Sequence, residues 1–233
     1  MIHNNINSDQ FIPIKTRKKI LYTLKNLLDE NKDKIINTLW NDLHKPPFET
    51  EFMEINQVIH EINVHLDNLD NWIIEKKFIN PLQYINISST GLNSAYIENR
   101  ALGKVLIIGA WNYPVNLSLL PLIGAISGGN FVTIMFPSLN YTKYTSNLMV
   151  ALFNKYFKTS PYIQAKIGGR DNITNILKLK WDKIFYTGSS QVGKIIYQKA
   201  SETLTPVVLE LGGKSPCIVD SSVNNLLVKR IVW

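Results

Sequence analysis

Cysteine is almost absent from this sequence, and so is any metal-binding pattern. Cys217 is the only cysteine in 233 residues, which excludes an intrachain disulfide and favours a reducing compartment. None of the spacings typical of metal ligands joins the four histidines, which are His3, His44, His60 and His65. We therefore expect a cytoplasmic protein without a metal site.

Long apolar runs are also missing. No charged residue lies in residues 105–142. However, prolines, asparagines and a glycine pair divide this stretch into pieces shorter than the ~20 apolar residues that a membrane helix needs. The polar, asparagine-rich start has neither the apolar centre of a signal peptide nor the arginines of a transit peptide. We therefore expect a disordered leader over residues 1–13 and no transmembrane segment.

Acidic residues are fewer than basic ones, 18 against 25, which gives a net charge of +7. The lysines are scattered and often stand beside acidic residues, as in Lys32-Asp33-Lys34. This pattern is typical of a solvated surface, because a face for nucleic acid needs clustered basic residues. We expect no nucleic-acid partner, although the charge is compatible with a weak attraction for phosphate-bearing ligands.

Residues 14–80 have the apolar spacing of two amphipathic helices. The first starts near Thr16 and ends at Lys45-Pro46-Pro47, because proline has no amide hydrogen to donate. The second runs over residues 55–73. We expect this antiparallel pair to pack as a scaffold on the domain that follows.

The pattern changes to strands after Asn80-Pro81. Residues 81–100 predict a strand pair, 84–87 with 94–98, because apolar and polar residues alternate there. Residues 101–213 then alternate short apolar strands with helices. This predicts an α/β fold, a doubly wound parallel sheet with right-handed crossovers. The expected strands are 105–108, 131–136, 162–167, 183–186 and 206–209. The expected helices begin near Val115 and continue with 142–157, 173–179 and 192–201. Ligands bind such sheets outside the carboxyl ends of the strands.

The first chemical motif is a strand that passes through a glycine turn into a helix, with the sequence FYTGSSQVGK at residues 185–194. Glycines let a backbone approach a ligand closely, and a helix amino terminus favours negative charge. The motif differs from the GxGxxG dinucleotide fingerprint. It also departs from the GxxxxGK[ST] phosphate loop, since Ile195 stands where a magnesium-binding hydroxyl is required. A nucleotide hydrolase and a plain structural turn remain the alternatives.

Two further motifs follow other strands. The sequence GAWNYP at residues 109–114 places Asn112 at a strand end, where a fixed amide suits an oxyanion or caps the next helix. The sequence LELGGKSP at residues 209–216 places Glu210 at the end of an apolar strand. A partly buried carboxylate there suits a general base, and the alternative is a solvated glutamate.

In this order and spacing, the three motifs resemble the aldehyde dehydrogenase superfamily over residues 16–233. The short amino terminus and the WNYP sequence look most like its class 3, the fatty aldehyde dehydrogenase branch. The resemblance implies a Rossmann-like domain at residues 101–213, NAD or NADP as cofactor, an aldehyde substrate and a homodimer. It also implies that residues 214–233 begin a catalytic domain. The implied reaction is attack of a cysteine on the aldehyde, hydride transfer to NAD(P)+ and hydrolysis of the thioester.

The resemblance also assigns residues to the site. Asn112 would supply the oxyanion donor and Glu210 the general base. The residues against the cofactor pyrophosphate would be Gly188, Ser189, Val192 and Gly193. The residues near the nicotinamide would be Leu211 and Gly212.

The sequence departs from the family in two places. Residues 133–138, TIMFPS, are one residue longer than the family's strand end and lack its ribose-contacting lysine, so we expect weaker cofactor binding. The family's catalytic cysteine, in a GQxC segment, lies beyond Trp233. Cys217 stands on an expected buried strand, where a free thiol is usually inert. We therefore expect no aldehyde oxidation by these 233 residues alone.

Three interpretations of the chain stay open. It is a fragment of an active enzyme, an inactive cofactor-binding relative, or a partner that binds another subunit through exposed surface. The first is favoured, because residues 224–233 begin an amphipathic helix and end on apolar residues. An exposed apolar patch, which promotes association, is expected at Leu226, Leu227, Ile231 and Trp233.

Overall fold

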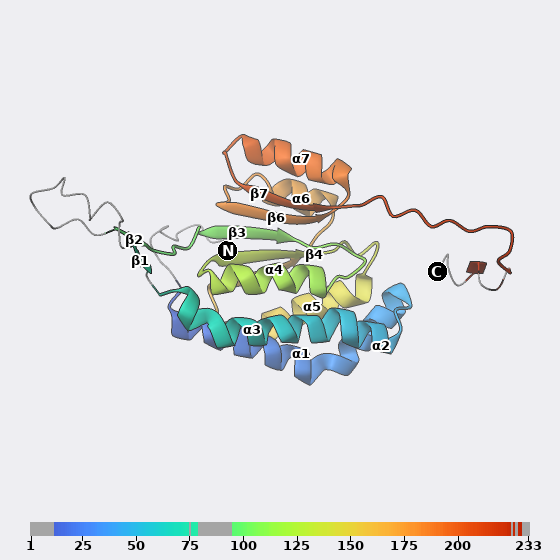
Figure 1. Ribbon diagram of the computed structural model, residues 1–233, viewed down its shortest axis with the longest axis horizontal. Coiled ribbons are helices and arrows are strands. Elements are labelled where there is room, and N and C mark those ends of the chain that lie inside the picture. Colours follow the sequence, from blue (N-terminus) through green and yellow to red (C-terminus); the bar gives the residue numbers. More distant parts are fainter. Residues whose placement is uncertain (1–11, 75, 79–94, 225, 227, 230–233) are drawn as a thin grey trace, which may run out of the picture.

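The computed structural model describes residues 12–74, 76–78, 95–224, 226, 228 and 229. Its centre is a five-stranded sheet with the strand order β5-β4-β3-β6-β7, and every neighbouring pair is parallel. The strands are β3 (Lys104–Ile108), β4 (Phe131–Phe136), β5 (Ile163–Ile167), β6 (Lys183–Gly188) and β7 (Val207–Leu211). The helices between them are α4 (Asn116–Ser127), α5 (Lys143–Tyr156), α6 (Arg170–Ile176) and α7 (Ser190–Ser201). The predicted doubly wound α/β sheet is confirmed (Figure 1).

One predicted helix is displaced along the chain. Helix α6 covers Arg170–Ile176 instead of the predicted 173–179. It starts directly after Gly169, whose φ of 119° is favourable only for glycine. Leu177 and Leu179 follow the helix and still pack on the sheet, which explains why apolar spacing alone placed the helix too late.

The amino-terminal helices form an outer layer. Helix α1 (Ile14–Leu43) ends at His44, which adopts a left-handed conformation with φ of 50°. A short α2 (Pro47–Glu49) and a π-helical segment η1 (Thr50–Asn56) lead into α3 (Gln57–Trp72). The predicted helical pair is therefore confirmed, with a wider π-helical turn at the start of the second helix. No helix among the described residues is long and apolar enough to cross a membrane.

Two boundaries before the sheet differ from the sequence analysis. Ile12 belongs to the predicted leader, yet its side chain is fully buried and its amide donates to the Gly129 carbonyl at 3.4 Å. Ordered structure thus begins before residue 14. Strand β2 (Ala95–Ile97) pairs antiparallel with β1 (Lys76–Phe78). The predicted partner, residues 84–87, lies outside the described residues.

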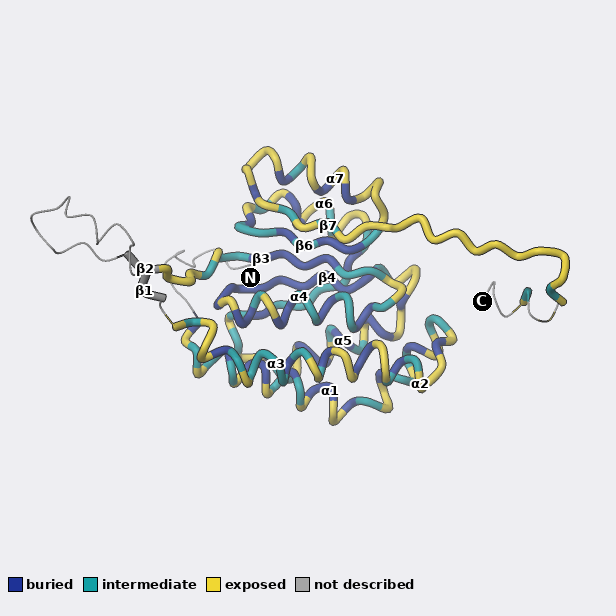
Figure 2. The backbone as a smooth tube through the Cα atoms, viewed as in Figure 1, coloured by how far each residue is buried: buried dark blue, intermediate teal, exposed yellow. Residues whose placement is uncertain are grey.

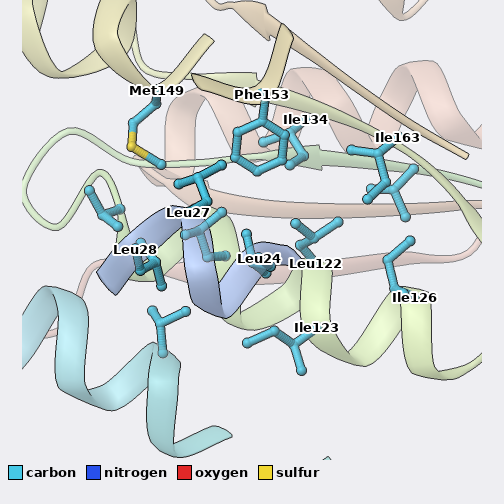
Figure 3. Packing of buried hydrophobic residues seen from close by; sticks show 14 of the residues in the cluster. Leu24, Leu27, Leu28, Leu122, Ile123, Ile126, Ile134, Met149, Phe153 and Ile163 are labelled. Carbon is cyan, nitrogen blue, oxygen red and sulfur yellow. The ribbon is translucent and has the colours of Figure 1, made fainter. Parts of the chain in front are cut away.

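The two faces of the sheet bury separate cores. Val105, Ile107 and Ile134 point to the face covered by α4 and α5, with α1 and α3 behind them; Figure 3 shows part of this cluster. Leu106 and Ile108 point to the other face, where α6 and α7 form a smaller cluster. This alternation follows from the period of two along a strand. The larger core lies on the side of the amino-terminal helices.

Candidate functional site

The candidate site lies at the carboxyl edge of the sheet between β3 and β6. From β3 the chain proceeds to β4 and β5 on one side, then crosses to β6 and β7 on the other side. Connections after β3 and β6 therefore leave toward opposite faces, and ligands of open α/β sheets bind at such a switch point. Residues 109–115 follow β3 and Gly188-Ser189 joins β6 to α7, so both predicted motifs lie here.

The turn from β6 to α7 contains a glycine and a serine that caps the amino terminus of α7. Gly188 has a φ of 156°, and the Oγ of Ser189 accepts a hydrogen bond from the Val192 amide at 3.4 Å. The hydroxyl of Tyr186 donates to the Ser189 carbonyl at 3.1 Å, and burial raises the pKa of this phenol above its ordinary value. The amides of the first turn of a helix lack intrahelical partners and attract anions.

Strand β7 brings the third motif beside this turn. Thr187 pairs with Glu210 and Gly188 with Leu211 in the parallel register. Gly193 is buried, and a Cβ on it would lie 2.9 Å from Cδ2 of Leu211. The absence of a side chain at Gly193 therefore lets α7 pack closely on β7.

Glu210 is more exposed than expected from its position in the sequence. Glu210 and Gly212 are exposed, and Leu211 is 37% exposed. The prediction of a partly buried Glu210 is wrong for the described residues. The physical reason is that β7 is the edge strand of the sheet and no described element extends beyond it.

Asn112 lies in the loop that follows β3. Gly109 at the start of this loop donates its amide to the Met135 carbonyl at 3.1 Å. Asn112 itself is exposed, and its carbonyl accepts a hydrogen bond from Nζ of Lys45 at 2.6 Å. It does not cap α4, whose N-cap position is Val115. The helix-cap alternative for Asn112 is therefore wrong.

A buried ion pair that was not expected from the sequence supports this loop. Nζ of Lys45 lies 2.7 Å from Oε1 of Glu54, and the two side chains are 6% and 0% exposed. Burial raises the pKa of Glu54, although Lys45 and the amides of Asn116 and Val115 oppose the shift. The only signal in the sequence is a glutamate directly before the apolar positions of the second helix.

The end of β4 contains no cation. Met135 and Phe136, which replace the family's lysine region, are 1% and 0% exposed. Phe136 packs into the core with its ring centroid 5.7 Å from that of Phe153. The exposed rings of Trp111, which follows β3, and Tyr141, which follows β4, stack with 5.8 Å between centroids and 20° between planes. Aromatic rings thus border the site where the resemblance expects a lysine.

The sequence-predicted residues form one compact group and one separate residue. Gly188, Ser189, Val192 and Gly193 lie beside Leu211, Gly212 and Glu210, through the pairing of β6 with β7. Asn112 belongs to the neighbouring strand on the other side, since β3 also pairs with β6. All lie on the same edge of the sheet. No hydrogen bond within the described part of the chain links the side chains of Asn112 and Glu210.

The segment after β7 lies apart from the body of the protein (Figure 1). Cys217 is exposed, and residues 212–220 form neither helix nor strand. The predicted buried strand around Cys217 is wrong, because a strand needs a neighbour to pair with and no described segment lies beside this one. Leu226 is 63% exposed, and the other three residues of the predicted apolar patch lie outside the described residues.

Known proteins share both the sequence and the fold. The aldehyde dehydrogenase family profile matches residues 9–233. Aldehyde dehydrogenase family 3 comG of Dictyostelium discoideum is 42% identical over 229 residues, covering 96% of this chain and 47% of that protein. The substrate-bound structure of AldH from Staphylococcus aureus has a TM-score of 0.82 and 37% identity, covering 92% of this chain and 45% of that chain.

A more distant structure shows the same fold. The Mycobacterium tuberculosis aldehyde dehydrogenase complexed with NAD+ has a TM-score of 0.73 and 23% identity, covering 88% of this chain and 40% of that chain. The chain spans about half the length of the curated relatives it matches. The match to the family profile extends over nearly all of these residues. The chain therefore belongs to the aldehyde dehydrogenase family.

Proposed function

We propose that residues 101–213 bind NAD(P)+ at the carboxyl edge of β3 and β6, as part of an enzyme that oxidises an aldehyde to a carboxylic acid. The observation that carries this proposal is the Gly188-Ser189 turn, which presents the amino terminus of α7 at the switch point of the sheet. The Mycobacterium tuberculosis relative with the same fold was solved with NAD+.

The residues at this edge fit a dinucleotide. The amides of the first turn of α7 have no intrahelical partners. Gly188 adds no side chain beside them, so a pyrophosphate can approach the backbone of the turn closely. Gly212 follows β7, and a Cβ on it would meet nothing within 4 Å, so no described residue blocks a flat ring there.

Within this proposal, the residues have distinct roles. Gly188, Ser189, Val192 and Gly193 form the turn against the pyrophosphate, and Leu211 and Gly212 lie near the nicotinamide. When bound, NAD(P)+ supplies the hydride acceptor. Asn112 donates a hydrogen bond to the oxygen that develops negative charge. Glu210, an exposed carboxylate at the same edge, accepts a proton as general base.

We assign no nucleophile among the described residues. The resemblance places the catalytic cysteine beyond Trp233, and Cys217 stands on the segment that leaves the body of the protein. Aldehyde oxidation is therefore proposed for the whole enzyme, together with its homodimeric state and a cytoplasmic location. Cofactor binding is proposed for these 233 residues.

Calorimetric titration of the 233-residue chain tests the proposal. NAD+ or NADP+ should bind, and more weakly than to a relative with the ribose-contacting lysine, because each lost hydrogen bond to a charged group costs about 1.5–3 kcal/mol. Gly188→Ala should weaken binding, since its Cβ would collide with the Tyr186 ring. Gly124→Ala is the matched control, because a Cβ there meets nothing within 4 Å.

Two results would contradict the proposal. Binding of ATP with magnesium, but of neither dinucleotide, would favour the nucleotide hydrolase alternative. Equal binding by the wild type and Gly188→Ala would place the ligand elsewhere on the protein. If the chain binds the cofactor but no longer form of the protein oxidises aldehydes, the protein is instead an inactive relative that binds the cofactor or another subunit.

A further inference from the structure

Lys45 and Glu54 form a buried ion pair between the amino-terminal helices and the loop that carries Asn112. Their side chains are 6% and 0% exposed, with 2.7 Å between Nζ and Oε1. Removing two charges from water is costly, and their mutual attraction offsets this cost only when further hydrogen bonds complete the site. The other hydrogen-bond partners of Lys45 and Glu54 therefore show which part of the chain the ion pair holds in place.

The ammonium group of Lys45 has three N–H donors, and the structure provides three partners. One is Oε1 of Glu54 at 2.7 Å, and another is the carbonyl of Asn112 at 2.6 Å. The third is the face of the Tyr113 ring, with its centroid 3.7 Å from Nζ. Two of the three partners belong to consecutive residues of the Asn112 loop.

The second oxygen of Glu54 holds the other end of the same loop. Oε2 accepts hydrogen bonds from the amides of Val115 at 3.0 Å and Asn116 at 2.9 Å. These amides lie at the start of α4, whose own N-cap residue makes no side-chain hydrogen bond. A carboxylate at this position satisfies free amides and complements the helix dipole. Glu54 therefore caps α4 from a distant part of the chain.

Helix α2 and the π-helical segment η1 add contacts to the same loop. The hydroxyl of Tyr113 donates to Oε1 of Glu49 at 3.2 Å, and Nδ2 of Asn116 donates to the Met53 carbonyl at 2.7 Å. One stretch of chain, residues 45–54, thus contacts residues 112, 113, 115 and 116. π-Helical turns occur frequently at functional sites.

We propose that Lys45 and Glu54 are positioning residues for Asn112, holding the backbone of residues 112–116 so that the Asn112 amide has one fixed place at the sheet edge. The proposal rests on the proposed function, in which Asn112 is the donor for the oxyanion. Apolar side chains of similar size would fill the same volume. The charges add directional bonds to the loop, and a donor for a transition-state oxyanion acts through its fixed position.

The test separates positioning from simple stabilisation. The double variant Lys45→Met/Glu54→Leu removes both charges together, so no buried charge is left without its partner. The 15N relaxation of the full 233-residue chain should give Asn112 an order parameter of about 0.85 in the wild type and below ~0.6 in the double variant. The side-chain amide of Asn112 should show the same change. Cooperative urea unfolding should be retained.

The control is a more exposed pair that also involves η1. Lys32 of α1 forms an ion pair with Glu51 of η1, and their side chains are 38% and 41% exposed. The variant Lys32→Met/Glu51→Leu should leave the order parameter of Asn112 at the wild-type value. If the first double variant does not fold, Glu54→Gln replaces it. This amide keeps an acceptor for Val115 and Asn116 but loses the carboxylate beside Lys45, so Asn112 should loosen more than Asn116.

A folded double variant in which Asn112 stays as ordered as in the wild type would overturn the proposal. So would equal loosening of Asn112 in the Lys32/Glu51 control, or a Glu54→Gln variant that loosens Asn116 more than Asn112. Titration of the wild-type chain with NAD+ is read separately at the Gly188 turn. Absence of binding there contradicts the proposed function and leaves the order of Asn112 as an independent result.

Discussion

The side of the sheet that contains β3 and β4, the covered side, and the side that ends in β7, the open side, differ in how far their strands are buried. Every residue of β4 is buried, because the larger core with α4 and α5 covers one face of it and the smaller cluster, which includes Met135, covers the other. On the other side, β7 is an edge strand with no buried residue. Figure 2 shows the contrast between the buried strands β3 and β4 and the exposed chain from β7 onward.

The candidate site spans the boundary between these two sides. Asn112 follows β3 on the covered side and is held by the buried Lys45–Glu54 pair. Glu210 and Leu211 lie on the open side, where the chain itself covers little of them. The comparison indicates that the backbone at Asn112, the proposed oxyanion donor, is held by these 233 residues, whereas Glu210 and Leu211, the proposed general base and nicotinamide contact, are only partly enclosed by them.

The largest difference in the free energy of unfolding is expected when a large side chain is truncated on the covered side and a smaller one on the open side. Phe136→Ala should lower the free energy of unfolding by about 3–5 kcal/mol, since a fully buried ring leaves a cavity when it is removed. Val208→Ala on β7, where the side chain is 38% exposed, should cost less than about 1 kcal/mol. Urea unfolding measures both, and equal losses would contradict the comparison.

A smaller loss of stability is expected from replacing Arg17, near the start of α1 on the covered side. Arg17 is 9% exposed and donates to the carbonyls of Ile12 at 2.6 Å and Ser127 at 2.9 Å. Arg17→Met should cost about 2–3 kcal/mol, because hydrogen bonds from charged groups are the stronger ones. Arg100→Met, which removes an exposed ion pair with Glu98, should change stability by less than ~1 kcal/mol. Thermal unfolding that ranks them the other way would reject this assignment.

A loss of about 1 kcal/mol is expected on the open side for Ser189→Ala, because Ser189 is the N-cap of α7. The same variant should weaken binding of NAD(P)+ at the turn. Ser201→Ala at the other end of α7, where the hydroxyl donates to Gln198, should leave binding unchanged. Unfolding and calorimetry on the three proteins check this, and equal affinities would exclude Ser189 from the cofactor site.

The smallest expected effect is a dependence of the free energy of unfolding on pH. Burial raises the pKa of Glu54 above its ordinary value of 4.5, so the folded protein binds this proton more tightly than the unfolded chain does. The stabilising contribution is complete below pH 4.5 and is lost as the pH rises through the folded pKa. The stability of the wild type relative to Glu54→Gln should therefore fall between acidic and neutral pH. A relative stability that rises instead would mean that Lys45 and the backbone amides outweigh burial.

The sequence predicted those parts of the fold that local pattern decides. The largely apolar run at residues 131–136 became a fully buried strand with the predicted bounds, since a strand covered on both faces has no position that faces solvent. The FYTGSSQVGK segment became a strand, a glycine turn and a capped helix. In both cases the physical cause lies within a few neighbouring residues.

The sequence did not predict what contacts between distant segments decide. Glu54 acts on Val115, 61 residues away, and nothing near either residue reveals this bond. The residues around Cys217 have the apolar pattern of a strand, but a strand requires a partner, and none lies beside them in the described structure. The burial of Glu210 likewise depends on what covers β7. The local sequence pattern thus predicts the conformation of a segment, but it does not predict the distant segment that packs against it.

The location of the ligand site is the central claim, and one measurement tests it most directly. Titrating the 15N-labelled chain with NAD+ should shift the amide resonances of residues 109–116, 188–193 and 210–212, the three segments at the carboxyl edge of the sheet. An alternative hollow lies along β5, lined by Ala165, Lys166 and Asn172. Shifts confined to those residues, or no shifts at millimolar NAD+, would contradict the proposed cofactor site between β3 and β6.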